Sequence, residues 1–126
     1  MAYAASAELV LITHPGNSTS QLSLEDAKKI FLGQATEYPG GAKAIPMDQK
    51  DGTPAKTEFL TKVLQKDSGQ VKAIWSKLIF TGGMIPPVAL GSDAEVKNKV
   101  ANTKGSLGYV SKGAEDSSVK VLLVVP

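Results

Sequence analysis

The sequence predicts an α/β fold with three layers, in which a mostly parallel sheet carries helices on both faces. Apolar runs of strand length alternate along the chain with segments whose apolar residues recur at the helical period. The first run, Leu9–Ile12, is apolar without interruption, which is typical of a strand buried on both faces, as in a parallel sheet. The 126 residues are enough for one domain, and we find no internal repeat or domain boundary.

The first predicted helix lies in the segment LSLEDAKKIFLGQ, residues 22–34. Ser23 is a good N-cap, and Gly33 suits the C-terminal end. The apolar residues of this segment fall on one helical face. They are Leu24, Ala27, Ile30 and Phe31.

A short strand and a second helix follow, in residues 43–49 and 54–65. Pro46 lies inside the strand, so we expect an edge position or a very short pairing. Thr53 is the predicted N-cap of the helix, and Pro54 occupies the first helical position, where its missing N–H costs nothing.

The third helix is the clearest, because its apolar residues follow the i, i+3, i+4, i+7, i+8 pattern between residues 67 and 81. We interpret Trp75, on this face, as a core residue. The segment MIPPVAL, residues 84–90, is predicted to be an irregular linker. Ser92 and Glu95 form a capping box for a fourth helix, and two strands, SLGYVS and VKVLLVV, end the chain.

These elements define an expected core. Ten residues on their apolar faces are predicted to be buried together. They are Leu11, Ile30, Phe31, Phe59, Leu60, Ile74, Trp75, Leu78, Val110 and Val121.

Composition excludes several classes of protein. All fourteen basic residues are lysines spread along the chain, and the net charge is +2, which argues against a nucleic-acid partner. The chain has no cysteine and a single histidine, His14, so a thiolate metal site, a disulfide framework and a histidine cluster are excluded. No nucleophile–base pair or phosphate-binding loop motif is present. The sequence therefore indicates no enzyme, no metal and no cofactor.

The first residues favour export. The segment AYAASA, residues 2–7, repeats the small-x-small pattern of a signal-peptidase site. We interpret residues 1–7 as the remnant of a signal-peptide cleavage region, and residues 8–126 as the folded unit of a soluble periplasmic protein. The alternative is a frayed, alanine-rich terminus.

Three segments, SLEDAKKIFLGQATEYPGG, DGTPAKTEFLTKVL and GSLGYV, come in an order and spacing similar to one lobe of the periplasmic phosphate-binding proteins of ABC transporters. More closely, the chain resembles the short, single-lobe proteins usually grouped with them. The resemblance covers nearly everything from Glu8 to about Lys112. It implies one lobe of a type II periplasmic-binding-protein fold, export, and recognition of phosphate or another small oxyanion.

The same resemblance points to the turn after the second strand. The family's D-G-S-G-T turn offers N–H groups and hydroxyls to phosphate, and Asp51 and Gly52 keep their places in it. The residues T-P-A-K then follow, and Asp48 and Gln49 stand where the family has basic residues. A carboxylate there repels phosphate, so we expect binding to be weak.

The candidate ligand-binding residues in this turn are Gly52, Thr53 and Lys56. An anion at a helix N-terminus meets free N–H groups and the positive end of the helix dipole, and Thr53 and Lys56 would add a hydroxyl and a charge. The alternative is that Thr53 only caps the helix and Lys56 is solvated.

A second group of candidates follows the first predicted strand and lies at the start of the third. Asn17 and Ser18 lie beyond the carboxyl end of a strand, where ligands bind in open α/β sheets. Ser106 begins the strand SLGYVS. The alternative is an ordinary polar turn at residues 14–20, and a mainly structural role for Gly105–Tyr109.

The apolar linker Met84–Val88 is either a partner surface or a loop packed on its own domain.

The sequence leaves two functions open for the protein. The first is a solute-binding domain that delivers phosphate or a similar oxyanion to a membrane transporter or sensor. The second is an interaction module that docks to a membrane sensor or forms a homodimer, with ligand binding weak or lost.

Overall fold

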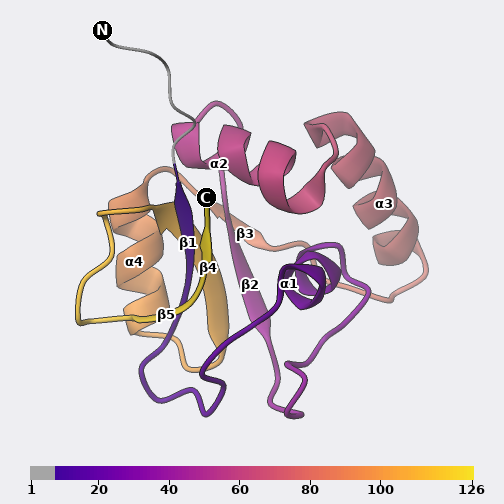
Figure 1. The fold of residues 1–126 in the computed structure, drawn as a ribbon. Coiled ribbons are helices and arrows are strands. Elements are labelled where there is room, and N and C mark those ends of the chain that lie inside the picture. The colour runs from indigo at the N-terminus through magenta and orange to yellow at the C-terminus, as the bar shows by residue number, and fades with distance from the viewer. Residues whose placement is uncertain (1–7) are drawn as a thin grey trace, which may run out of the picture.

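The computed structural model describes residues 8–126, and the predicted cleavage remnant at residues 1–7 lies outside them. Five strands form one sheet in the order β3-β2-β4-β1-β5. They are β1 (Leu9–Thr13), β2 (Ile45–Gln49), β3 (Val88–Leu90), β4 (Ser106–Ser111) and β5 (Lys120–Val125). Helices cover both faces, so the predicted α/β class is confirmed (Figure 1).

The direction of β1 differs from that of every other strand. β2 pairs in parallel with β3 and β4, whereas β1 pairs antiparallel with both β4 and β5. β1 is buried along its whole length, as its apolar run predicts. A central strand is covered on both faces in either orientation, so burial alone did not reveal its direction.

The helices are α1 (Leu24–Phe31), α2 (Pro54–Phe59), α3 (Ser68–Phe80) and α4 (Asp93–Ala101). The predicted N-caps hold: the Ser23 and Thr53 hydroxyls accept the N–H groups of Asp26 and Lys56. Beyond α2 the predicted helix widens into a π-helical segment, η1 (Leu60–Leu64), and ends at Gln65 in the left-handed region. The expected irregular linker includes β3, which pairs with β2.

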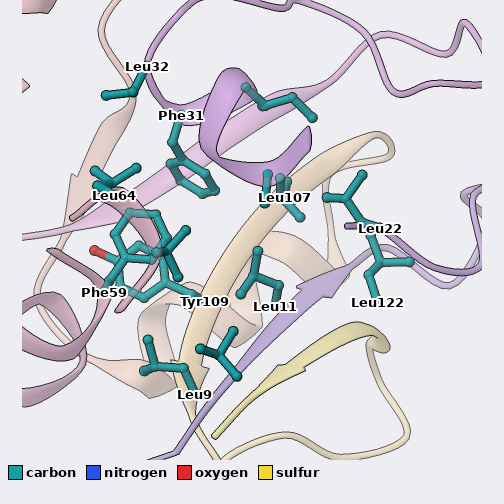
Figure 2. Close-up of a cluster of buried hydrophobic side chains, with 14 of the residues drawn as sticks. Leu9, Leu11, Leu22, Phe31, Leu32, Phe59, Leu64, Leu107, Tyr109 and Leu122 are labelled. Atoms are coloured by element: carbon teal, nitrogen blue, oxygen red, sulfur yellow. The ribbon is translucent and has the colours of Figure 1, made fainter. Parts of the chain in front are cut away.

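Two hydrophobic clusters lie on opposite faces of the sheet. The larger one joins β1, β4 and β5 to α1, α2 and η1, with Phe59 stacked on Tyr109 at 3.8 Å between ring centroids (Figure 2). The smaller one lies under α4. Gly108 allows that helix to approach, because a Cβ there would lie 2.7 Å from a methyl carbon of Val96.

The ten predicted core residues do not form one cluster. Leu11, Ile30, Phe31 and Phe59 lie in the larger cluster, whereas Val110 belongs to the cluster under α4. Four others, on η1 and α3, are only partly buried; they are Leu60, Ile74, Trp75 and Leu78.

The prediction for Val121 is wrong, because this residue is 36% exposed. The pairing of β5 with β1 shifts between Leu11 and Ile12, so that Leu122 becomes an extra residue and interrupts the alternation of faces. Val121 is paired with Ile12, so it faces the same side as the cluster under α4, but β5 is the outermost strand there and Val121 stays exposed.

Pro46 lies in an interior strand, but the pairing of β2 with β4 is as short as the proline predicts. It joins only Ile45 and Pro46 of β2 to β4, and Met47–Gln49 pair with β3 instead. Within residues 8–126, no helix has the length and apolar character needed to cross a membrane.

Candidate functional site

The predicted site residues divide between two opposite edges of the sheet. Because β1 runs against β2, the carboxyl end of β1 meets the amino ends of β2 and β4. We call this the amino edge, and the opposite edge, where β2 and β4 end, the carboxyl edge. The carboxyl edge holds Gly52, Thr53 and Lys56, and the amino edge holds Asn17, Ser18 and Ser106.

The turn at the carboxyl edge has the expected backbone. Gly52 takes a positive φ of 96°, and a Cβ there would meet no atom within 4 Å. Thr53 then caps α2, since its hydroxyl accepts the Lys56 N–H at 3.2 Å. The hydroxyl oxygen is therefore already used as an acceptor by the helix.

The Lys56 ammonium turns inward instead of facing solvent. Its Nζ lies 2.7 Å from Oδ2 of Asp48, and the two residues are 5% and 3% exposed. The same Nζ lies 5.8 Å from the centre of the Trp75 ring. Lys56 is thus a buried ion-pair partner, and its charge is compensated within the chain.

Two further groups donate to the Asp48 carboxylate. The Tyr109 hydroxyl and the Gln49 N–H both reach Oδ1, the latter at 2.8 Å. Burial raises the pKa of the Tyr109 phenol far above its ordinary value, and the Asp48 charge raises it further. Tyr109 therefore stays protonated and remains a donor. Asp48 is surrounded by the kinds of donor that an anion site would offer.

Gln49 extends this cluster toward α4. Its side-chain amide donates to Oδ1 of Asp93 at 2.9 Å and to the Tyr109 carbonyl at 3.0 Å. Asp48 and Gln49 are thus built into the interior of the domain.

Asp51 lies on the outer side of the same edge. Its carboxylate accepts from Lys72 at 3.1 Å and from the Ser68 hydroxyl at 3.0 Å, both on α3. The Lys72 hydrogen bond holds the pKa of Asp51 below its usual value. This exposed pair fixes the start of α3 to the turn.

At the amino edge, Asn17 supports the fold. Its amide donates to the Thr13 hydroxyl at 2.9 Å, and its side-chain oxygen accepts the Thr19 N–H at 3.0 Å. The Asn17 backbone carbonyl accepts the Lys120 ammonium. Asn17 is buried, so these contacts account for its orientation.

Ser106 is equally internal. Its hydroxyl donates to the Thr103 carbonyl at 2.7 Å, and its own carbonyl accepts the hydroxyls of Thr13 and Tyr38. Tyr38 also reaches the Gly105 carbonyl at 2.8 Å. Burial raises the pKa of Tyr38, so this phenol stays protonated as well.

Two of the predicted residues, Asn17 and Ser18, line an open hollow, and Ser18 is the exposed one of the two. The hollow has a volume of about 430 Å³ and is lined by residues 16–18, 42–43 and 104–105. Two exposed lysines, Lys43 and Lys104, are among these residues, and sequence reasoning did not single them out. They are far apart in sequence and belong to no motif, so only the fold brings them together.

The linker Met84–Val88 forms an apolar groove of about 490 Å³ with the end of α1 and the start of β2. Met84 packs back onto the domain, because a Cβ at Gly33 would lie 2.7 Å from its sulfur. Two neighbouring residues project outward: Phe80 is 91% exposed and Ile85 is 87% exposed. The linker thus both packs on its own domain and presents apolar surface.

The sheet order, the reversed central strand and the helices on both faces define the class of fold. It is the α/β fold of the periplasmic binding proteins, and the comparison with solved structures confirms the resemblance at this level. No protein-family model matches the chain, and no curated protein matches it.

Three of the similar structures are receptors for phosphate transport. A Clostridium perfringens protein described as a phosphate ABC transporter substrate-binding protein, solved with bound phosphate, is 22% identical with a TM-score of 0.70. An ABC-type phosphate transport receptor from Vibrio cholerae is 19% identical, also with a TM-score of 0.70. PstS from Borrelia burgdorferi is 18% identical with a TM-score of 0.69.

Each comparison covers 92% of this chain but only 45%, 46% and 47% of the respective structure. The chain therefore spans slightly less than half the length of the receptors that share its fold.

Proposed function

We propose that the chain is an exported solute-binding domain that recognises phosphate or a similar small oxyanion, in association with a membrane transporter or sensor. The observation that carries the proposal is the shared fold with three phosphate-transport receptors, one solved with phosphate bound. Binding, not catalysis, is the role that this likeness favours.

The proposed oxyanion site is the turn at the carboxyl edge, where Gly52 is open to solvent and Thr53 begins α2. Its affinity is low in the isolated chain, because Lys56 is paired with Asp48 and Pro54 has no N–H to offer. Each missing charge-assisted hydrogen bond costs about 1.5–3 kcal/mol, so losing two weakens binding by roughly a hundredfold or more. A second lobe or chain would complete the site.

Calorimetric titration with phosphate, sulfate and a nucleotide tests the proposal. We expect weak phosphate binding that Thr53→Val reduces further, because the hydroxyl is lost while the chain keeps its charge. A surface variant such as Thr57→Val, on the same helix, is the matched control. Micromolar phosphate binding by the monomer that survives Thr53→Val would show that the site lies elsewhere.

A second candidate function is an interaction module that docks to a sensor or to a second copy. The internal pairing of Lys56 with Asp48 and the projecting side chains of Phe80 and Ile85 favour it. Light scattering at increasing concentration tests self-association. We expect Phe80→Ser with Ile85→Ser to lower the average mass without changing the unfolding midpoint, and a strict monomer in the wild type would refute the homodimer.

Export is part of the same proposal. The small-x-small segment at residues 2–7 supports it. Fractionation of cells that express the natural gene would place the protein in the periplasm if the proposal is correct, and in the cytoplasm if it is wrong.

A further inference from the structure

The hollow at the amino edge brings two cations together from different loops. Lys43 precedes β2 and Lys104 precedes β4, and both line a space of about 430 Å³ next to Ser18. The side chain of Lys104 extends across Gly16, because a Cβ at Gly16 would lie 3.9 Å from its Cε atom. The two lysines thus line the same hollow.

Neither cation is neutralised within the part of the chain that the structure describes. Lys43 and Lys104 form no ion pair among residues 8–126, and no aspartate or glutamate lines the hollow. Glu37 lies across from Lys43 in an isolated bridge, but it is not one of the lining residues. Two like charges that share a concave surface raise the local concentration of anions.

The backbone around Gly105, which lines the hollow, is held by close packing and hydrogen bonds. Gly105 has a φ of 83°, and a Cβ there would lie only 2.8 Å from the Lys43 carbonyl oxygen, so the two loops are in close contact. The Tyr38 hydroxyl and the Ile45 N–H both donate to the Gly105 carbonyl. A preformed site loses little conformational entropy when a ligand binds.

From this geometry we propose that the hollow binds the phosphate group of a phosphorylated small molecule, between Lys43 and Lys104 and beside the Ser18 hydroxyl. Lysine holds phosphate as a point charge, and a serine hydroxyl adds a directional donor. The volume exceeds that of inorganic phosphate severalfold and falls within the range of pockets for small organic ligands. The body of the ligand lies along Gly16 and Ala42.

This site is independent of the oxyanion site in the proposed function. The two lie at opposite edges of the sheet, and they share no residue. An experiment that disproves one of these sites therefore does not disprove the other.

The test is a titration monitored by amide chemical shifts in NMR, with ribose 5-phosphate and pyrophosphate as probes and ribose as the uncharged control. We expect ribose 5-phosphate to shift residues 16–18, 42–43 and 104–105, and ribose to shift none of them. Lys43→Gln with Lys104→Gln should weaken binding about tenfold or more, since two charge-assisted contacts are lost. Thr53→Val should leave these shifts unchanged.

The matched control is Lys29→Gln with Lys77→Gln, which removes the same net charge from exposed positions on α1 and α3. This pair should retain the affinity of the wild type. Equal weakening by both pairs would show general charge attraction and would overturn the proposal. Shifts confined to residues 51–56, or none up to about 10 mM ligand, would also overturn it.

Discussion

The two edges of the sheet hold similar chemistry and use it in opposite ways. At the carboxyl edge, the Lys56 ammonium, the Tyr109 hydroxyl and the Gln49 N–H all converge on Asp48 inside the protein. At the amino edge, the exposed residues Lys43 and Lys104 line a hollow that is open to solvent. The difference shows that a residue's place in a motif does not tell whether its charge is available to a ligand.

The physical reason is the cost of burying charge. A buried ammonium must have an internal counter-charge, and once it has one, its attraction for an outside anion is largely cancelled. An exposed ammonium has no such requirement, although water screens it. The lysine charge at the carboxyl edge, where the turn with the expected backbone lies, is thus less available to an outside anion than the charges at the amino edge.

The largest effect is expected when the carboxylate buried at the carboxyl edge is removed. Asp48→Ala should lower the free energy of unfolding by about 3–5 kcal/mol, because it leaves the Lys56 charge buried without a partner. Urea unfolding at pH 7 measures the loss.

The matched control for this change is Asp51→Ala, which removes an exposed partner of Lys72 and should cost about 1 kcal/mol or less. Adding Lys56→Met to Asp48→Ala should recover part of the stability. A cost below that of Asp51→Ala would mean that Lys56 turns out to solvent, where it would be free to meet an anion.

A smaller effect is expected when the phenol that donates to Asp48 is removed. Tyr109→Phe should cost about 1–3 kcal/mol, since one oxygen of a buried carboxylate loses a donor. The variant should also change how the free energy of unfolding depends on pH in the alkaline range.

The sign of that pH effect follows from the raised pKa of Tyr109 in the folded state. The stability due to the protonated phenol is fully present below its unfolded pKa, near 10, and is lost as pH rises above that value, by up to about 1.4 kcal/mol per pH unit. Urea midpoints between pH 9 and pH 11 should fall more steeply for the wild type than for Tyr109→Phe. If the midpoints of the wild type and of Tyr109→Phe fell equally steeply with pH, the pH dependence could not be assigned to Tyr109.

The smallest expected effect on stability is at the outer, exposed part of the carboxyl edge. Asp51 has a folded-state pKa below its ordinary value of 3.8, so its contribution is present above that pH and disappears as pH falls through the folded-state value. Asp51→Asn should cost a few tenths of a kcal/mol at pH 7 and nothing well below pH 3, as solvent screens the pair. A constant difference across this range, measured by thermal unfolding, would assign the effect to Ser68 and not to charge.

Much of the fold could be predicted because its signals are local. Helix caps such as Ser23 and Thr53 act within three residues, and the apolar faces of the helices repeat at a fixed period. The structural role suggested for the segment Gly105–Tyr109 fits Gly108, because a glycine within a strand often marks the close approach of another element, here Val96 of α4.

The failures have non-local causes. The direction of β1 depends on its partners, and the exposure of Val121 depends on a shift of register within β5. The pairing of Lys56 with Asp48 depends on how α2 turns over the end of β2, and the placement of Lys43 and Lys104 around one hollow depends on the pairing of β2 with β4. Whether the six predicted ligand-binding residues bind an anion stays a prediction.

The central position of β1 also has a consequence for the kinetics of folding. Its neighbours on both sides, β4 and β5, come from the other end of the chain, and Thr13 bonds to a carbonyl 93 residues away. The entropy of closing so long a loop must be lost before the middle of the sheet gains any hydrogen bond, which places folding among the slower topologies, on the millisecond-to-second scale. Until β1 is inserted, the inner edge of β4 stays unpaired and open to wrong partners. The edge of β4 that β1 covers in the folded protein is therefore the part of the sheet that stays exposed longest during folding.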